Sequence, residues 1–431
     1  MKKTACFFLV FGLLSASFAE DMEPLMVSST RSLAMGGTHV AYTDDVYALF
    51  VNPAALQKAN QGAAFEISPA LVGPLFDMID LANAIQGNAI VGLGNFAEKT
   101  GGKIPIGFDL RGPLSVGYTA NGFGFGIWDR VHMDMEVIGT DIEAAVLTDL
   151  ILNFGMSFSV LTLGDHDVDA GFVIKPFARV KAGMGVTALD AVGGGLNNIV
   201  EEFNVPLIAG AGFDLGFMYR FRKNLAAGMT IDDVYTGGGK VSTIFGKDDG
   251  VSSYRVPATL NLGAAYTLQP LSWLGFAFML DYRDVTNLFS AGDYTKRNPI
   301  LNLAFGTELS LVQFIKLRIG LNEMLPAAGF GIEAKAFQFN VAIYGKELST
   351  EPGGFSTYGV DLSIAIRPET KEKEWPWSRP IVNTILEKRA PPRNEASGPV
   401  EIKARAPTPE EEAEAAAEGS LRRLDEALNE P

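Results

Sequence analysis

Apolar and polar residues alternate one by one over much of the chain between residues 62 and 367. From Phe123 to Val137 the odd positions are mostly apolar, whereas the even positions are mostly glycine or charged and include Trp128. The same pattern recurs over residues 213–221, 256–266 and 360–366. Because successive side chains of a strand point to opposite faces, each stretch predicts a strand with one apolar and one small or polar face.

The alternation predicts many strands, and several have ten residues or more, which is long for a soluble domain. We expect fourteen, at about residues 62–68, 105–119, 122–137, 148–162, 167–182, 205–221, 224–235, 255–267, 273–285, 299–313, 315–323, 328–335, 338–349 and 356–367.

The connections between the predicted strands differ in length in a regular way. Tight turns follow the even strands, and Ala120-Asn121-Gly122 is the clearest of them, because Asn-Gly favours a hairpin turn. Long connections follow odd strands, at 69–104, 183–204, 236–254 and 286–298. An even strand count with short turns at one rim and long loops at the other is typical of outer-membrane barrels. The predicted fold is therefore all-β, a 14-stranded antiparallel transmembrane β-barrel, closed because lipid cannot satisfy an open sheet edge.

A secreted soluble β-sandwich is the alternative fold, and apolar and polar residues would also alternate along its strands. It would have shorter strands and would bury its apolar face. The opposite face here is rich in Gly, Ala, Asn, Asp, Arg and Thr, which suits a wet or plugged lumen. The stretch from Tyr358 to Ile364 also resembles the closing-strand signal read by the barrel-assembly machinery, an expected partner, although it does not end the chain.

The first residues resemble an export signal. Lys2 and Lys3 precede an apolar core from Thr4 to Leu14, and small residues at Ser17 and Ala19 predict a signal peptide over residues 1–19, cleaved after about Ala19. The only cysteine, Cys6, lies inside it, so the mature chain would have no disulfide or cysteine ligand. After the predicted signal peptide the sequence contains no run of about 18 apolar residues, so it predicts no membrane-spanning helix.

The last residues differ in composition from the predicted strands. Residues 368–431 form a Pro/Glu/Ala-rich tail, with a linker over 391–409 and a short helix over 410–429. With an even strand count this tail would lie in the periplasm, either solvated or docked to a periplasmic or secretion partner. The net charge of −15 makes nucleic acid a poor partner.

Two of the long loops have helical spacing of apolar residues. Both loops would lie outside the cell, and their apolar faces suit equally a ligand groove or simple packing over the barrel mouth. The candidate ligand-binding residues are Leu75, Phe76, Ile79, Leu196, Ile199 and Phe203.

The sequence gives little indication of metal binding or catalysis. His39, His132 and His166 share no metal-ligand spacing, and no serine, histidine and acid set suggests a hydrolase. We therefore expect no enzyme activity, no cofactor and no metal. Asp232 and Asp233 follow a predicted strand and are expected in a solvated loop.

The segment from Met35 to Leu56 reads MGGTHVAYTDDVYALFVNPAAL and has neither helical nor strand periodicity. It resembles the N-terminal signature of the FadL-like outer-membrane family of long-chain fatty-acid and hydrocarbon channels, and most closely the branch of PorV-type proteins and uncharacterised spirochaete barrels. Weaker similarity extends over much of residues 30–367. The matching hatch or gating residues are Gly36, Gly37, Asp44, Asp45, Asn52, Pro53 and Ala54.

The resemblance implies that residues 20–61 form a hatch inside a barrel of residues 62–367 in the cell outer membrane. It also implies hatch-gated passive uptake of hydrophobic small molecules such as long-chain fatty acids, with exit past the hatch or sideways through a wall kink. Outer-membrane lipid and the transported molecule would be its partners. Two alternatives stay open: a PorV-like barrel serving secretion or surface assembly, and a surface adhesin or antigen.

Overall fold

A computed structural model describes residues 20–59, 62–73, 103–138, 141–187, 205–222, 224–245, 253–289, 297–312, 314–334 and 336–367. The predicted signal peptide, the apolar faces at 75–85 and 189–203, and the tail from 368 lie outside the described residues. No helix among the described residues is long and apolar enough to cross a bilayer.

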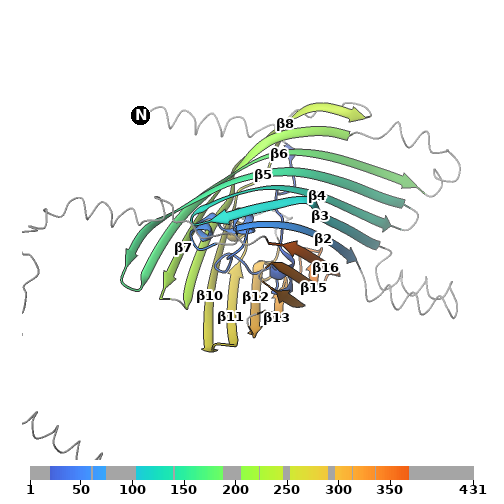
Figure 1. Cartoon of the computed structure of the whole chain (residues 1–431). Coiled ribbons are helices and arrows are strands. Elements are labelled where there is room, and N and C mark those ends of the chain that lie inside the picture. Colours follow the sequence, from blue (N-terminus) through green and yellow to red (C-terminus); the bar gives the residue numbers. More distant parts are fainter. Residues whose placement is uncertain are drawn as a thin grey trace, which may run out of the picture. The chain divides into compact units, whose positions relative to one another are not determined.

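Fourteen antiparallel strands form a closed barrel (Figure 1). Each pairs with its sequence neighbour, the last with the first, and β7 with β8. The strands are β2 (Gly62–Gly73), β3 (Lys103–Ala120), β4 (Phe123–Ile138), β5 (Asp141–Leu163), β6 (His166–Thr187), β7 (Val205–Phe221), β8 (Leu225–Phe245), β10 (Thr259–Leu271), β11 (Leu274–Tyr282), β12 (Leu303–Leu311), β13 (Ile315–Asn322), β14 (Leu325–Glu333), β15 (Phe337–Glu347) and β16 (Ser356–Ile366). Two short strands, β1 (Glu20–Asp21) and β9 (Ser253–Arg255), add to the same sheet beside β8.

The remaining elements are short helices. The N-terminal segment contains α2 (Thr30–Ala34), α3 (Ala48–Val51) and the 3-10 helix η2 (Pro53–Gln57). Two further 3-10 helices, η3 (Val285–Phe289) and η4 (Pro299–Asn302), lie between β11 and β12.

All fourteen predicted strands are present, but some are longer than the sequence indicated. β5 begins at Asp141 instead of about 148, because residues 141–147 pair with residues 132–138 of β4. β8 continues to Phe245 and so includes residues 236–245 of the predicted connection at 236–254. The reason is that β7 pairs with β8 up to Phe245 and that β9 pairs with Gly237–Gly239. A glycine-rich stretch that predicted a loop is therefore strand.

Apolar side chains point out of the barrel and polar side chains point in. Phe217 and Ile319 are 40% and 62% exposed, whereas Asp214 and Asp361 are each 1% exposed. This is the reverse of a soluble sandwich, which would bury its large apolar residues. An outward apolar face on a wall without edges is the arrangement that a bilayer requires.

Aromatic side chains gather on the outer face near the short turns. Tyr118 stacks on Phe125 with 5.5 Å between ring centroids, and Phe276 stacks on Phe278 at 6.4 Å. Other members of this band are Phe123, Phe158, Phe172, Tyr219 and Phe221. Aromatic belts of this kind mark the membrane–water interface of spanning barrels.

Several strand pairs contain register shifts, and two of these bulges bear on the site described below. Residues 112–115 of β3 lie opposite residues 128–129 of β4, and Gly112 has a φ of 90°. Residues 232–234 of β8 lie opposite Asp214 of β7, and Asp233 has a φ of 54°. Extra residues of this kind bend a strand and redirect its side chains.

The outward face makes a testable prediction about lipid. Ile319→Arg places a charge in the middle of an eight-residue wall strand and should lower the free energy of unfolding in lipid vesicles by about 2–4 kcal/mol. Met324→Arg, in the rim turn after that strand, is the control and should cost about 0–1 kcal/mol. Equal effects of the two substitutions would contradict the assignment of this face to lipid.

Candidate functional site

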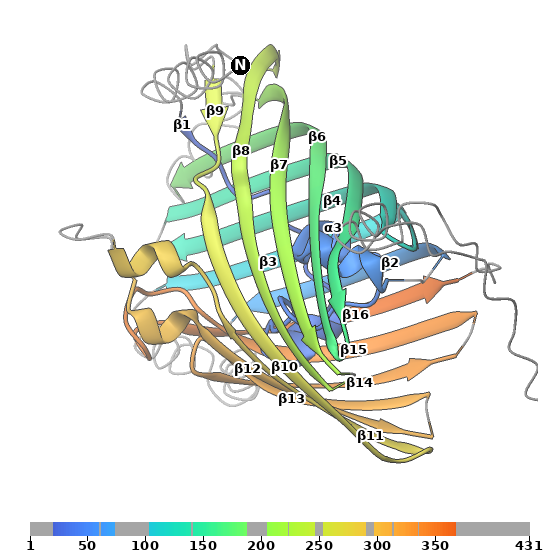
Figure 2. The same cartoon turned by 90° about the vertical axis from the view of Figure 1, so that its left-hand side faces the viewer.

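The N-terminal segment (residues 22–59) lies inside the ring of strands, as the blue chain in Figures 1 and 2 shows. Its helices contact opposite parts of the wall. α2 packs against β13 to β16, whereas η2 packs against β5, β6 and β7. Most of its side chains are buried, and Ala34, Leu49 and Asn52 have no exposed area.

Both ends of the N-terminal segment share one apolar cluster with the wall. The cluster combines Leu25 and Val27 with Tyr47 and Phe50, and places them against Trp128 of β4. The Phe50 ring meets the Trp128 ring edge-on at 5.2 Å. Residues 28–45 therefore leave this cluster, cross the lumen and return to it.

Inward-facing glycines of the wall receive the N-terminal segment. A Cβ on Gly320 would lie 2.3 Å from the backbone carbon of Met35, and one on Gly171 would lie 2.5 Å from the Pro53 carbonyl oxygen. Both contacts involve backbone atoms that no rotamer change can move, so only glycine fits. Similar close contacts occur at Gly117, Gly124, Gly155, Gly216, Gly228, Gly263, Gly306 and Gly329.

The predicted hatch glycines end α2. Gly36 and Gly37 have φ values of 70° and 80°, which glycine adopts without strain. The Gly37 N–H donates to the Ser32 carbonyl at 2.8 Å, and the chain reverses direction there.

The two predicted hatch aspartates have separate roles. Asp44 accepts from the Arg31 guanidinium at 2.5 Å. Asp45 accepts from the Tyr47 backbone N–H at 2.9 Å and so begins the turn into α3. Burial, reinforced by the charge of Asp44, raises the pKa of Asp45 above its ordinary value.

The Asn-Pro-Ala part of the motif joins the two halves of the segment to the wall. Asn52 donates to the Val40 carbonyl at 2.8 Å and to the Phe217 carbonyl of β7 at 3.2 Å, and its side-chain oxygen accepts from the Ala54 N–H. Pro53 begins η2, and the Ala54 carbonyl accepts from Ser157 of β5 at 3.1 Å. The residues of the motif thus position the segment, and their gating role stays a prediction.

Arg31 is the functional residue that the motif did not indicate. Its Nε lies 3.0 Å from the Glu308 carboxylate of β12, its Nη2 donates to the same carboxylate at 3.1 Å, and its guanidinium lies 5.0 Å from the Tyr42 ring centroid. The sequence feature that could have identified Arg31 is its charge, since it is the only lysine or arginine between Lys3 and Lys58.

A second buried ionic cluster corrects one expectation. Asp232 and Asp233 were expected in a solvated loop, but they lie in the β8 bulge, and Asp233 is only 5% exposed. The Lys175 ammonium is 2.8 Å from Asp214 and 3.2 Å from Asp233. The bulge turns Asp233 inward, where Lys175 compensates its charge.

An upper cavity of about 230 Å³ lies on the long-loop side of residues 28–45. The N-terminal segment contributes Met26, Val27 and Leu33, which form an apolar surface. The wall contributes Ala70, Val72, Asp109, Arg111, Arg130, His132, Tyr344 and Lys346. The cavity therefore combines an apolar part with a charged part, which suits a molecule with an apolar body and a polar end.

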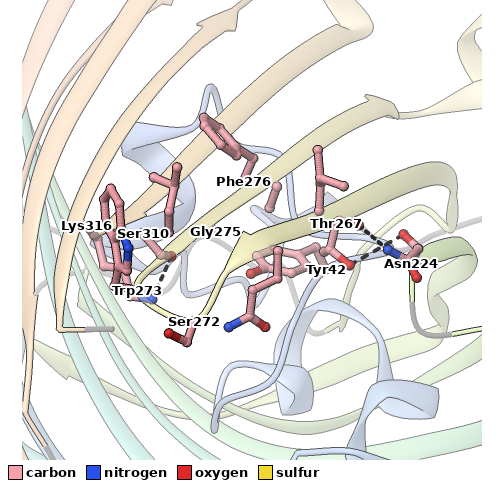
Figure 3. A pocket seen from close by; sticks show the side chains of 13 residues that line it. Tyr42, Asn224, Thr267, Ser272, Trp273, Gly275, Phe276, Ser310 and Lys316 are labelled. Atoms are coloured by element: carbon pink, nitrogen blue, oxygen red, sulfur yellow. Dashed lines mark hydrogen bonds between the residues drawn. The ribbon is translucent and has the colours of Figure 1, made fainter. Parts of the chain in front are cut away.

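A lower cavity of about 490 Å³ lies on the short-turn side (Figure 3). Tyr42 projects into it from the N-terminal segment, while Trp273 and Lys316 line it from the wall. Lys316 donates to the Ser310 hydroxyl at 2.8 Å. A void of only about 10 Å³ lies within the N-terminal segment itself, and Arg31, His39 and Tyr42 are among the residues that line it. Met26, Val27 and Leu33 of the segment border the upper cavity and Tyr42 borders the lower one, so the segment lies between the two cavities.

The structure does not test the predicted ligand site, because its candidate residues Leu75, Phe76, Ile79, Leu196, Ile199 and Phe203 lie outside the described residues. His39, His132 and His166 have separate partners in Ser32, Asp109 and Tyr219. Within the described ranges, no group of three or more His, Cys, Asp or Glu side chains is placed to bind a metal.

Solved structures of two toluene transporters and of a FadL homologue are similar to this chain. The toluene transporter TodX of Pseudomonas putida is 15% identical over 81% of this chain and 100% of its own, with a TM-score of 0.44. The toluene transporter TbuX of Ralstonia pickettii is 13% identical over 81% and 99%, with a TM-score of 0.43. A Pseudomonas aeruginosa FadL homologue is 11% identical over 81% and 100%, with a TM-score of 0.40. No protein-family model and no curated protein matches.

The wall glycines give a testable prediction. Gly320→Ala places a Cβ against the backbone of Met35 and Gly36 and should lower the free energy of unfolding by about 1–3 kcal/mol, the usual cost of overpacking. It should also expose residues 28–45 to limited proteolysis. Gly275→Ala is the control, because its new Cβ would meet only the Ser310 Cβ at an ordinary 3.6 Å. Equal stability and protease resistance of the two variants would contradict close docking of the segment.

Proposed function

We propose that this chain is an outer-membrane channel for uptake of hydrophobic small molecules, such as long-chain fatty acids, by passive diffusion that the N-terminal segment gates as a hatch. The outward apolar face and the aromatic band support the membrane location. The observation that carries the proposal is a lumen divided by residues 28–45 into two cavities toward opposite rims.

The chemistry of the cavities supports an amphipathic cargo. Met26, Val27 and Leu33 offer apolar area in the upper cavity, while Lys346 offers positive charge to a polar end beside the Arg130–Asp109 ion pair. The lower cavity, with Trp273 and Lys316 on its wall, repeats the combination. Because the segment lies between the two cavities, we expect a molecule to pass from one to the other only when residues 28–45 move.

Uptake by reconstituted protein tests the proposal. Vesicles containing the full chain should take up labelled fatty acid faster than empty vesicles, and deletion of residues 30–56 should raise the flux further because it joins the two cavities. Flux equal to that of empty vesicles for both proteins would contradict the channel. Co-purification of a stoichiometric envelope partner would then favour the assembly role.

A reversible lock tests gating separately. The Thr30 and Ser68 hydroxyl oxygens lie 3.2 Å apart, so Thr30→Cys with Ser68→Cys can join α2 to β2 by a disulfide. Oxidation should stop uptake, and reductant should restore it in the same sample.

The matched control joins two positions within the wall. Ser159→Cys with Thr162→Cys replaces hydroxyls 3.5 Å apart in β5, and its oxidation should leave uptake unchanged. Uptake that persists in the oxidised α2–β2 variant would contradict gating by this segment and would favour a sideways exit, for which the β3 bulge beside Arg111 is the nearest wall irregularity to the upper cavity.

A further inference from the structure

We propose that α2 is the moving part of the hatch and that the Arg31–Glu308 ion pair is a latch, which holds α2 against the wall and can separate reversibly. This inference concerns the regulation of the proposed uptake path and rests on it. It identifies which contacts of the N-terminal segment separate and which persist.

The latch joins the N-terminal segment to the wall through a shared network. Arg31 pairs with Glu308 of β12 at 3.0 Å and with Asp44 of its own segment at 2.5 Å. Glu308 pairs also with Arg318 of β13 at 2.7 Å. When Arg31 leaves Glu308 with α2, the carboxylate keeps Arg318, whereas Asp44 stays with the fixed part beyond residues 39–40.

Retained partners make separation inexpensive. Breaking a buried ion pair is strongly unfavourable when it leaves an uncompensated charge, which this network avoids. Asp44 has a side chain that is 60% exposed, so water compensates its charge when Arg31 leaves. Release of Arg31 therefore leaves neither carboxylate uncompensated, which lowers the free-energy cost of opening.

The polar contacts of Thr30 with the wall, to Asp361 and Ser68, follow the same rule. The Thr30 hydroxyl donates to the Asp361 carboxylate of β16 at 2.5 Å. Asp361 also accepts from Ser68 at 2.8 Å and pairs with Arg111, and both of these partners belong to the wall. Departure of Thr30 therefore leaves Asp361 with its charge compensated.

The next part of the segment is attached differently. The backbone N–H groups of His39 and Val40 donate to one carboxylate oxygen of Asp281 in β11, at 2.7 and 3.0 Å. Asp281 is 1% exposed, and its other oxygen has no hydrogen-bond partner among the described residues. Removal of these two N–H groups would leave a buried carboxylate without donors, so residues 39–40 stay in place.

Gly36 and Gly37 connect the moving part to the fixed part. Their positive φ values lie in a region where glycine changes conformation at little cost, so the pair is suited to act as a hinge. Leu33 lines the upper cavity, and Arg31 and Ser32 line the void beside Tyr42. A rotation of α2 about the glycine pair would thus widen the constriction between the cavities.

Cysteine accessibility in the full-length protein, reconstituted without any transported solute, tests the latch. Ser32→Cys is a nearly isosteric reporter on α2, where Ser32 is 4% exposed, and Ala55→Cys reports on the fixed part, where Ala55 has no exposed area. The only natural cysteine is Cys6, in the predicted signal peptide. Glu308→Gln should raise the labelling rate at position 32 by a water-soluble thiol reagent roughly tenfold, the effect of losing one charge-assisted contact. Labelling at position 55 should not change.

A second variant removes the contact between α2 and the fixed part of the segment. Asp44 pairs with Arg31 at 2.5 Å and lies beyond the fixed residues 39–40. Asp44→Asn weakens this contact and should also raise labelling at position 32. Labelling at position 55 should again not change.

Arg220→Met is the control for loss of a buried ion pair, because Arg220 pairs with Asp169 within the wall and should leave labelling at both positions unchanged. Unchanged labelling at position 32 in Glu308→Gln, or equal acceleration at positions 32 and 55, would overturn the latch. Since no solute is present, such a result would leave the uptake measurements to decide the proposed function independently.

Discussion

The close approach of the N-terminal segment to inward-facing glycines is the contact on which the rest of the structure depends. At Gly171 and Gly320 the backbone of the segment lies where a Cβ would otherwise be. This approach brings the carbonyl and N–H groups of an irregular chain within reach of wall side chains such as Asn153, Ser157 and Asp281. Irregular backbone inside a membrane barrel is stable only when such partners exist.

The contacts of the N-terminal segment with the wall differ along its length. Its two ends share an apolar cluster with Trp128 of β4. Residues 28–45 reach the opposite wall, where Ala34 and Met35 join apolar clusters and Arg31 pairs with Glu308. Because Glu308 keeps Arg318 as a second counter-charge, α2 can separate from the wall, while the N–H groups bound to Asp281 hold residues 39–40. A stable anchor and a releasable α2 thus arise from different contacts.

Much of the barrel could be predicted from the sequence, because strands that follow each other in the chain pair with each other and because their side chains alternate with a period of two residues. The alternation at Phe123–Val137 placed β4 within one residue, and the inward position of Asp214 and Asp361 followed from the same rule. The strand extensions at 141–147 and 236–245 could not be predicted, because backbone pairing with β4 and β7 stabilises them more than their own composition does. Likewise, the alternation pattern cannot indicate a bulge, and the β8 bulge turned Asp233 inward.

The candidate site was only partly predictable, for a physical reason. The motif identified Gly36, Asp44 and Asn52, whose contacts are largely local, but Arg31–Glu308 joins residues 277 positions apart. Hydrogen–deuterium exchange in nanodiscs tests most directly the claim that a fixed segment has a movable middle. Amides of residues 30–37 should exchange much faster than those of residues 48–57, although both stretches are buried. Equal protection of the two stretches would contradict the account.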